Sequence, residues 1–83
     1  MSLYKRYVDV ETLITKEGQY VPLKLYWNQD GAVLKYEIDK IIMIKKSYSI
    51  VGGCGILYKC KIQGHVRNLF WEQNRWFIES HTP

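Results

Sequence analysis

Residues 69–78, with the sequence LFWEQNRWFI, constrain the fold more than any other part of this chain. A two-residue loop at positions 73–74 would place the flanking residues opposite one another on antiparallel strands. The facing pairs would then be Glu72 with Arg75 and Trp71 with Trp76. Oppositely charged pairs and aromatic pairs each stabilise such strands by roughly 0.2–1 kcal/mol. The alternative is a longer turn in which Asn74 is left-handed, and both interpretations predict a β-hairpin here.

The length and the aromatic content predict one small folded domain, residues 1–83. A chain of 83 residues buries only about 60–65% of its unfolded surface, so its core needs large side chains. Seven Tyr, three Trp and two Phe supply them, and apolar residues at 47% are too many for a disordered segment.

Turn residues and alternating apolar residues divide the chain into short strands. The expected strands are residues 5–15, 20–27, 33–36, 41–46, 56–62, 65–71 and 75–79. Pro22 cannot donate a ladder hydrogen bond, which predicts a sheet edge or a bulge at that position. Residues 80–83 are expected to form a frayed tail.

Alternation also assigns side chains to faces in two of these strands. One side of the strand at 20–27 is expected to carry Val21, Leu23, Leu25 and Trp27. In the strand at 56–62 the inward residues are expected to be Ile56, Tyr58, Cys60 and Ile62, and the outward residues Lys59 and Lys61.

Residues 33–48 form a run that is too long for one ordinary strand. Polar residues near position 39 interrupt it, and residues 41–44 are continuously apolar. We therefore expect a short strand, a bend at residues 37–40 that could hold one helical turn, and then a more buried strand at 41–46.

Six or seven short strands joined by turn-length loops predict an all-β antiparallel meander. In a domain this small, closing the sheet into an SH3-like or Sm-like barrel removes the exposed strand edges. The alternative is an open, curled sheet that pairs through its edge with a second copy.

Composition also bears on the cell compartment and on partners. The net charge of +4 permits attraction to acidic partners, but it is also ordinary for a small soluble domain. No apolar stretch reaches the roughly 20 residues of a membrane span, and two cysteines give little support for a disulfide framework. We expect a cytoplasmic protein with reduced thiols and no membrane partner.

The residues with reactive side chains do not form a recognisable catalytic or metal-binding motif. The glycine-rich stretch at 51–55 precedes an expected strand, whereas a phosphate-binding loop needs a following helix. The spacing of Cys54, Cys60, His65 and His81 matches no zinc motif. Cys54 with His65 would lack an orienting third group. A disulfide between the two cysteines would require the loop to fold back. We expect no enzyme activity, no metal and no cofactor.

The chain resembles a group of small uncharacterised all-β proteins from low-GC Gram-positive bacteria. The resemblance rests on the segment GGCGILYKCKIQG at 52–64, the continuation LFWE at 69–72, and RWFIE at 75–79. Residues 36–44 also fit, so the likeness covers most of the chain. It implies the fold and a bacterial origin, and it carries no activity.

Single-stranded nucleic acid is one candidate partner. Small β-barrels bind single strands with a basic groove and exposed aromatic platforms. The candidate residues are Lys45, Lys46, Tyr48, Lys59, Lys61 and Arg67, with Lys24, Tyr20 and Tyr26 as an extension. If the strands at 56–62 and 65–71 are neighbours, Lys59, Lys61 and Arg67 are expected on one surface. The alternative is that these lysines only keep the outer face soluble and block edge pairing.

A protein partner is the other candidate, and we favour it. Tyr26, Leu69 and Trp71 are the candidate interface residues, since Trp and Tyr dominate interface energetics. Leu69 and Trp71 share one face of their strand and Phe70 takes the other, so both faces are apolar. Either the fold covers both faces or a partner covers one. The sequence thus predicts a non-enzymatic binding module for a protein or its own copy, with single-stranded nucleic acid as the alternative.

Overall fold

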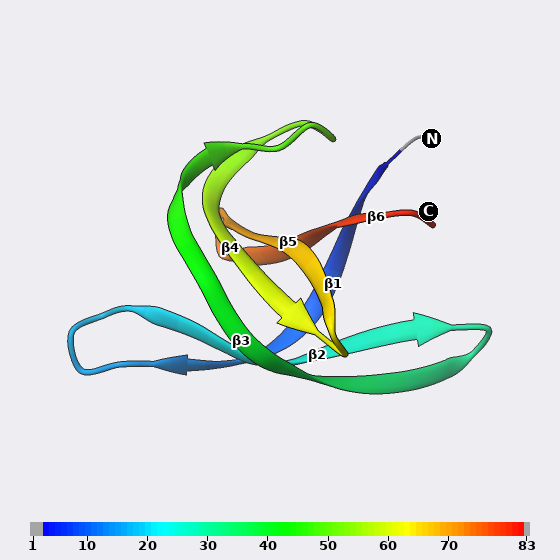
Figure 1. Ribbon diagram of the computed structural model, residues 1–83. Helices are drawn as coiled ribbons and strands as arrows, with labels where there is room; N and C mark the ends of the chain where they lie inside the picture. Colours follow the sequence, from blue (N-terminus) through cyan, green and yellow to red (C-terminus); the bar gives the residue numbers. More distant parts are fainter. Residues whose placement is uncertain (1–2, 83) are drawn as a thin grey trace.

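The computed structural model describes residues 3–82, and the chain between them forms a six-stranded antiparallel barrel (Figure 1). The strands are β1 (Tyr4–Ile14), β2 (Tyr20–Gln29), β3 (Ala32–Tyr48), β4 (Cys54–Ile62), β5 (His65–Glu72) and β6 (Arg75–Ser80). Each strand pairs with the next, and β6 pairs with β1 to close the barrel. The predicted all-β, SH3-like or Sm-like closed meander is therefore confirmed.

Two long strands, β1 and β3, each pair with one neighbouring strand along their first part and with the other neighbour along their second part. β1 pairs with β6 from Tyr4 to Val8 and with β2 from Asp9 to Ile14. β3 pairs with β2 up to Glu37 and with β4 from Ile38 onward. As a result, the β1–β2 and β2–β3 turns project from opposite sides of the barrel (Figure 1).

The predicted irregularity at Pro22 is a bulge in β2. Thr12 pairs with Pro22 and Glu11 pairs with Lys24, so Leu23 is an extra residue on β2. The bulge reverses the alternation, because Pro22 is buried whereas Leu23 is 41% exposed. The prediction that Val21 and Leu23 share a face with the core residue Leu25 was therefore wrong.

Residues 32–48 form one strand of 17 residues instead of two strands and a bend. Its register with β4 shifts at two places, where Asp39 and Ile42 have no direct partner. These bulges bend the strand without ending it. The expectation that residues 41–46 are the more buried part was also wrong, since most of this stretch is exposed.

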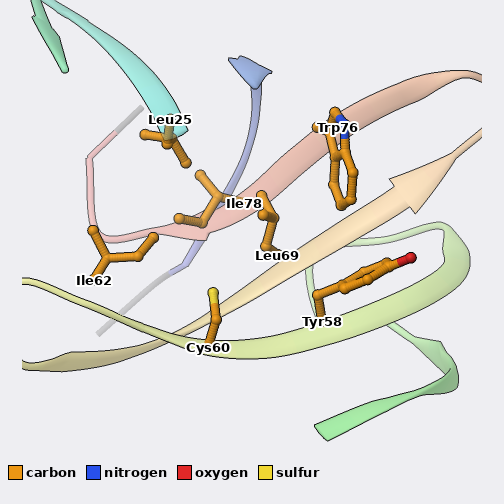
Figure 2. Packing of buried hydrophobic residues seen from close by; sticks show 7 residues of the cluster. All are labelled: Leu25, Tyr58, Cys60, Ile62, Leu69, Trp76 and Ile78. Atoms are coloured by element: carbon orange, nitrogen blue, oxygen red, sulfur yellow. The ribbon is translucent and has the colours of Figure 1, made fainter. Parts of the chain in front are cut away.

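The barrel interior holds the main hydrophobic core, and β4 supplies much of it as predicted. Tyr58, Cys60 and Ile62 point inward among the buried residues, and Ile56 packs against them. Figure 2 shows Ile62 grouped with Leu25 and Ile78 at one end of the core and Tyr58 with Trp76 at the other. The remaining buried residue of this cluster is Leu69.

A second, smaller cluster lies on the outer face of the sheet. It consists of Leu57, Phe70 and Phe77, and Val51 from the β3–β4 loop packs against it. Glu79 holds this loop: it accepts a hydrogen bond of 2.6 Å from Ser49 and one of 2.8 Å from the Asn68 amide. The fold itself thus covers both faces of the apolar strand β5.

The final hairpin has the predicted two-residue loop, and the longer turn is wrong. Glu72 faces Arg75 and Trp71 faces Trp76. Gln73 and Asn74 have φ angles of 48° and 64°, which is the conformation of a type I′ turn. Beyond it, Ser80 pairs with Tyr4 inside β6 instead of fraying, and Pro83 lies outside the described residues.

Candidate binding surfaces

The lysines proposed for nucleic-acid binding lie on β3 and β4. Lys45 and Lys46 are exposed on β3, and Tyr48 at its end is 84% exposed. Lys59 and Lys61 occupy alternate positions on β4, on the outer face as predicted, because Cys60 between them points into the core.

Arg67 does not join these lysines. It faces Cys60 across the β4–β5 pair, so both residues lie on the inner side of the sheet. Val66 and Asn68 occupy the outer positions opposite Lys61 and Lys59. The prediction that Lys59, Lys61 and Arg67 share one surface was wrong.

Lys40 takes the place beside the outer lysines that Arg67 was expected to fill. It faces Lys61 directly across β3 and β4, and both side chains are exposed. Like charges at facing positions destabilise a sheet. The bulge at Asp39 produces this pairing, so alternation in the sequence did not indicate it.

The three residues predicted to form a protein interface lie in three different environments. Leu69 is fully buried, so it contributes nothing to the surface. Trp71 is half-buried inside the barrel and stacks on Tyr20, with ring centroids 4.6 Å apart. Tyr26 donates a hydrogen bond of 3.3 Å to Glu11 and lies under the Lys35 ammonium.

The structure instead exposes apolar residues along one edge of β3. β2 pairs with β3 only from Ala32 to Glu37, so residues 38–48 have β4 on one side and, within residues 3–82, no strand on the other. Ile42 is 45% exposed, Met43 39% and Ile44 55%. We call the surface formed by Ile42, Met43, Ile44, Lys45, Lys46 and Tyr48 the β3 edge surface.

This surface continues into the barrel opening. Ile44 faces Tyr58 of the core across β3 and β4, and Lys46 faces Ile56. Ile56 in turn faces Trp71. The half-buried side chains of Ile56 and Trp71 therefore extend the apolar surface inward from the edge.

The glycine-rich loop has a structural role. Gly52 and Gly53 have φ angles of 97° and 84°, in the left-handed region that favours glycine. A Cβ atom on Gly55 would collide with the Trp71 carbonyl. These glycines let the loop turn back and cover Phe70 and Phe77.

An ion pair fixes the start of β4 to β1. Lys5 Nζ lies 3.1 Å from Glu72 Oε1, and the Cys54 amide donates a hydrogen bond of 2.9 Å to Glu72 Oε2. The hydrogen bond from Lys5, with that from Cys54, lowers the pKa of Glu72. The same contact with Glu72 raises the pKa of Lys5.

The two cysteines are separate thiols. Cys60 is buried, and burial raises its pKa to about 11, whereas Cys54 is exposed. Cys54 and His65 lie at opposite ends of the β4–β5 pair, since His65 faces Ile62, roughly 26 Å along β4 at about 3.3 Å per residue. Within residues 3–82 no three potential metal ligands lie together.

No protein-family model, curated protein or solved structure matches this chain. The resemblance to the Gram-positive group therefore stays a prediction. The described part of the chain contains no helix that is long and apolar enough to cross a membrane.

Proposed function

We propose that this protein is a non-enzymatic interaction module that binds an extended segment of another protein along the β3 edge surface. The observation that supports this proposal most is that residues 38–48 have only one neighbouring strand within residues 3–82. This stretch exposes the large side chains of Ile42, Met43, Ile44 and Tyr48. A bound segment would add a strand to β3, gaining affinity from main-chain hydrogen bonds and specificity from side-chain contacts.

The charge of this edge favours an acidic partner. Lys45 and Lys46 are exposed on the free part of β3, and Lys40 adds a third cation near its bulge. Asp39 is the one acidic residue between positions 38 and 48. An extended segment that alternates apolar and acidic residues would match the apolar and basic side chains of the edge.

The same charges argue against a second copy as the partner. β3 is regularly paired from Met43 to Tyr48, beyond its last bulge. Antiparallel pairing of two copies about the middle of this stretch would place Lys45 and Lys46 against their counterparts. Facing like charges destabilise a sheet, and the net charge of +4 adds repulsion.

Single-stranded nucleic acid is a second candidate, on the outer face of β3 and β4. The observation that favours it is that Lys40 and Lys61 face each other, because the phosphates of a bound strand would reduce the repulsion between them. Binding of this kind should weaken steeply as salt rises, since each neutralised phosphate releases counterions. If the protein binds neither single-stranded DNA nor single-stranded RNA at low salt, this candidate is excluded.

The test of the protein-binding proposal is an NMR titration with an acidic peptide of about ten residues that alternates valine with glutamate. We expect amide shifts in residues 38–48 and no binding of the valine–lysine analogue. Ile44→Asp should weaken binding by about tenfold or more. Val33→Asp is the matched control, since Val33 is 64% exposed on the β2–β3 hairpin and outside the β3 edge surface.

Light scattering tests the choice of partner. We expect a monomer at micromolar concentration, and a dimer lost in Ile44→Asp would assign the edge to a second copy instead. Equal binding of the peptide to the Ile44→Asp and Val33→Asp variants would contradict the proposed surface. The cytoplasmic location stays a prediction.

A further inference from the structure

A cavity of about 620 Å³ opens at the end of the barrel near the β2–β3 and β4–β5 turns. Its size lies within the range of about 300–1,000 Å³ found for small-molecule sites. Residues from β1 to β6 line it, including Arg6, Trp27, Tyr36, His65 and Arg67. None of the residues of the β3 edge surface lines it.

The floor and one wall of the cavity are apolar. Leu25, Ile62 and Ile78 form the floor, and they lie together at one end of the core (Figure 2). The half-buried rings of Tyr36 and Trp27 pack against the same core and form part of the wall. A flat ring of a ligand can be covered by such a lining.

Arg6 is held flat against this wall. Its guanidinium carbon lies 3.6 Å from the centroid of the Trp27 ring and it donates a hydrogen bond to the carbonyl of Asn28. Stacking on an aromatic ring fixes the plane of a guanidinium group. The orientation of the Arg6 guanidinium group in the cavity is therefore fixed by the fold.

Arg67 supplies a second guanidinium group to the cavity lining, from β5. It is half-buried on the inner side of β5, and no carboxylate within residues 3–82 forms an ion pair with it. Two acidic residues also line the cavity, Asp30 at the β2–β3 turn and Glu79 on β6. Ser49 and Asn68 on the outer face hold the two carboxylate oxygens of Glu79. A half-buried guanidinium group without a carboxylate is suited to bind an anion from solution.

We propose that this cavity binds a nucleotide-type ligand, with a phosphate group at Arg67 and a planar base against Tyr36, beside the stacked Arg6 and Trp27 side chains. Guanidinium groups recognise phosphate through paired N–H donors, and aromatic rings accept any base by stacking. A free mononucleotide and the end of a nucleic-acid strand share this chemistry. The proposal is independent of the protein-binding function of β3, because the two surfaces share no residue.

The test is calorimetry with AMP, UMP, inorganic phosphate and a four-nucleotide DNA strand, with NMR of the Trp27 indole N–H as the local readout. We expect saturable binding of a mononucleotide with a Kd below about 1 mM and a shift of the Trp27 signal. Inorganic phosphate should bind about tenfold more weakly, because it lacks the ring. Tighter binding of the strand than of both mononucleotides would identify a strand end as the source of the ligand.

Variants at Arg67 decide the role of the guanidinium group. Arg67→Gln should weaken mononucleotide binding by about tenfold or more, and Arg67→Lys should restore part of it by keeping the charge. Arg75→Gln is the matched control, since Arg75 is exposed, stacks on Tyr7 and does not line this cavity. Unchanged thermal unfolding would show that the Arg67 variants are folded.

Two results would overturn the proposal. One is the absence of any binding of mononucleotide and strand at about 10 mM, where even a millimolar site is occupied. The other is binding that Arg67→Gln and Arg75→Gln weaken equally, because that would reflect net charge alone.

Discussion

Phe70 and Phe77 stack face to face across β5 and β6, with ring centroids 4.9 Å apart and an angle of 6° between their planes. Both side chains are almost fully buried although they lie on the outer face of the sheet. The β3–β4 loop covers them, and Lys5 adds its ammonium group 4.5 Å from the Phe77 ring. This small domain thus has an apolar cluster on each side of one sheet.

Removing one ring of this stack should be as costly as a substitution inside the barrel. We expect Phe70→Ala to lower the free energy of unfolding by about 3–5 kcal/mol, and Phe70→Leu by about 1 kcal/mol. Urea denaturation measures both. Val66→Ala is the control, because Val66 is 48% exposed on the same face of β5. A Phe70→Ala variant as stable as this control would show that the loop does not cover the cluster.

Substitution of the two-residue turn at Gln73 and Asn74 should increase the stability of the fold. Both residues have positive φ without being glycine, and a left-handed conformation costs an ordinary residue about 1–2 kcal/mol. Replacing the pair with the preferred Asn-Gly sequence should raise the free energy of unfolding by about 1 kcal/mol. Thermal and urea unfolding check this, and a loss of stability would contradict the type I′ geometry.

The register of this hairpin could be predicted from the sequence because its loop length and its facing pairs agree. The same arithmetic applies to the β4–β5 turn, where Gln63 and Gly64 form another two-residue loop with positive φ. Counting outward from that loop pairs Arg67 with Cys60 and Leu69 with Tyr58, as in the structure. The inward positions of Arg67 and Leu69 could therefore have been predicted from the sequence.

The edge of β3 could not be predicted in the same way. The bulges at Asp39 and Ile42 change the side on which successive residues lie, so the alternation rule fails there. A continuous run of Ile and Met is also typical of a buried strand. Whether a neighbouring strand covers residues 38–48 depends on where β2 stops pairing with β3. That pairing ends at Lys24, and the first residues of β2, Tyr20 to Pro22, pair with β1 alone.

The Lys5–Glu72 ion pair predicts a loss of stability in acid. The pKa of Glu72 is lowered from its ordinary value of 4.5 by the hydrogen bond from Lys5. A lowered pKa means that the carboxylate stabilises the fold above the ordinary value, and this contribution is lost as pH falls through the folded-state pKa. We expect the Tm of the protein to fall as the pH drops below about 4.5. The Tm of the Glu72→Gln variant should fall less steeply over the same pH range. Glu17→Gln, on the exposed first turn, should leave the steepness unchanged.

The two thiols should differ in reactivity. Cys54 is exposed, whereas Cys60 is buried with a pKa raised to about 11. Because the thiolate is the reactive form, an aromatic disulfide reagent at about pH 8 should modify Cys54 within minutes and Cys60 only after unfolding. Cys54→Ser is expected to remove the fast phase. A fast phase that persists in this variant would contradict the burial of Cys60.

Hydrogen exchange along β3 tests the proposed binding edge most directly. In the protein alone, we expect the amide protons of residues 38–48 that point away from β4 to exchange rapidly, while those bonded to β4 are protected. The acidic valine–glutamate peptide should slow the rapid set and leave β5 unchanged. If these amides are already protected in the monomer, or still exchange rapidly with the peptide bound, then β3 does not receive an added strand.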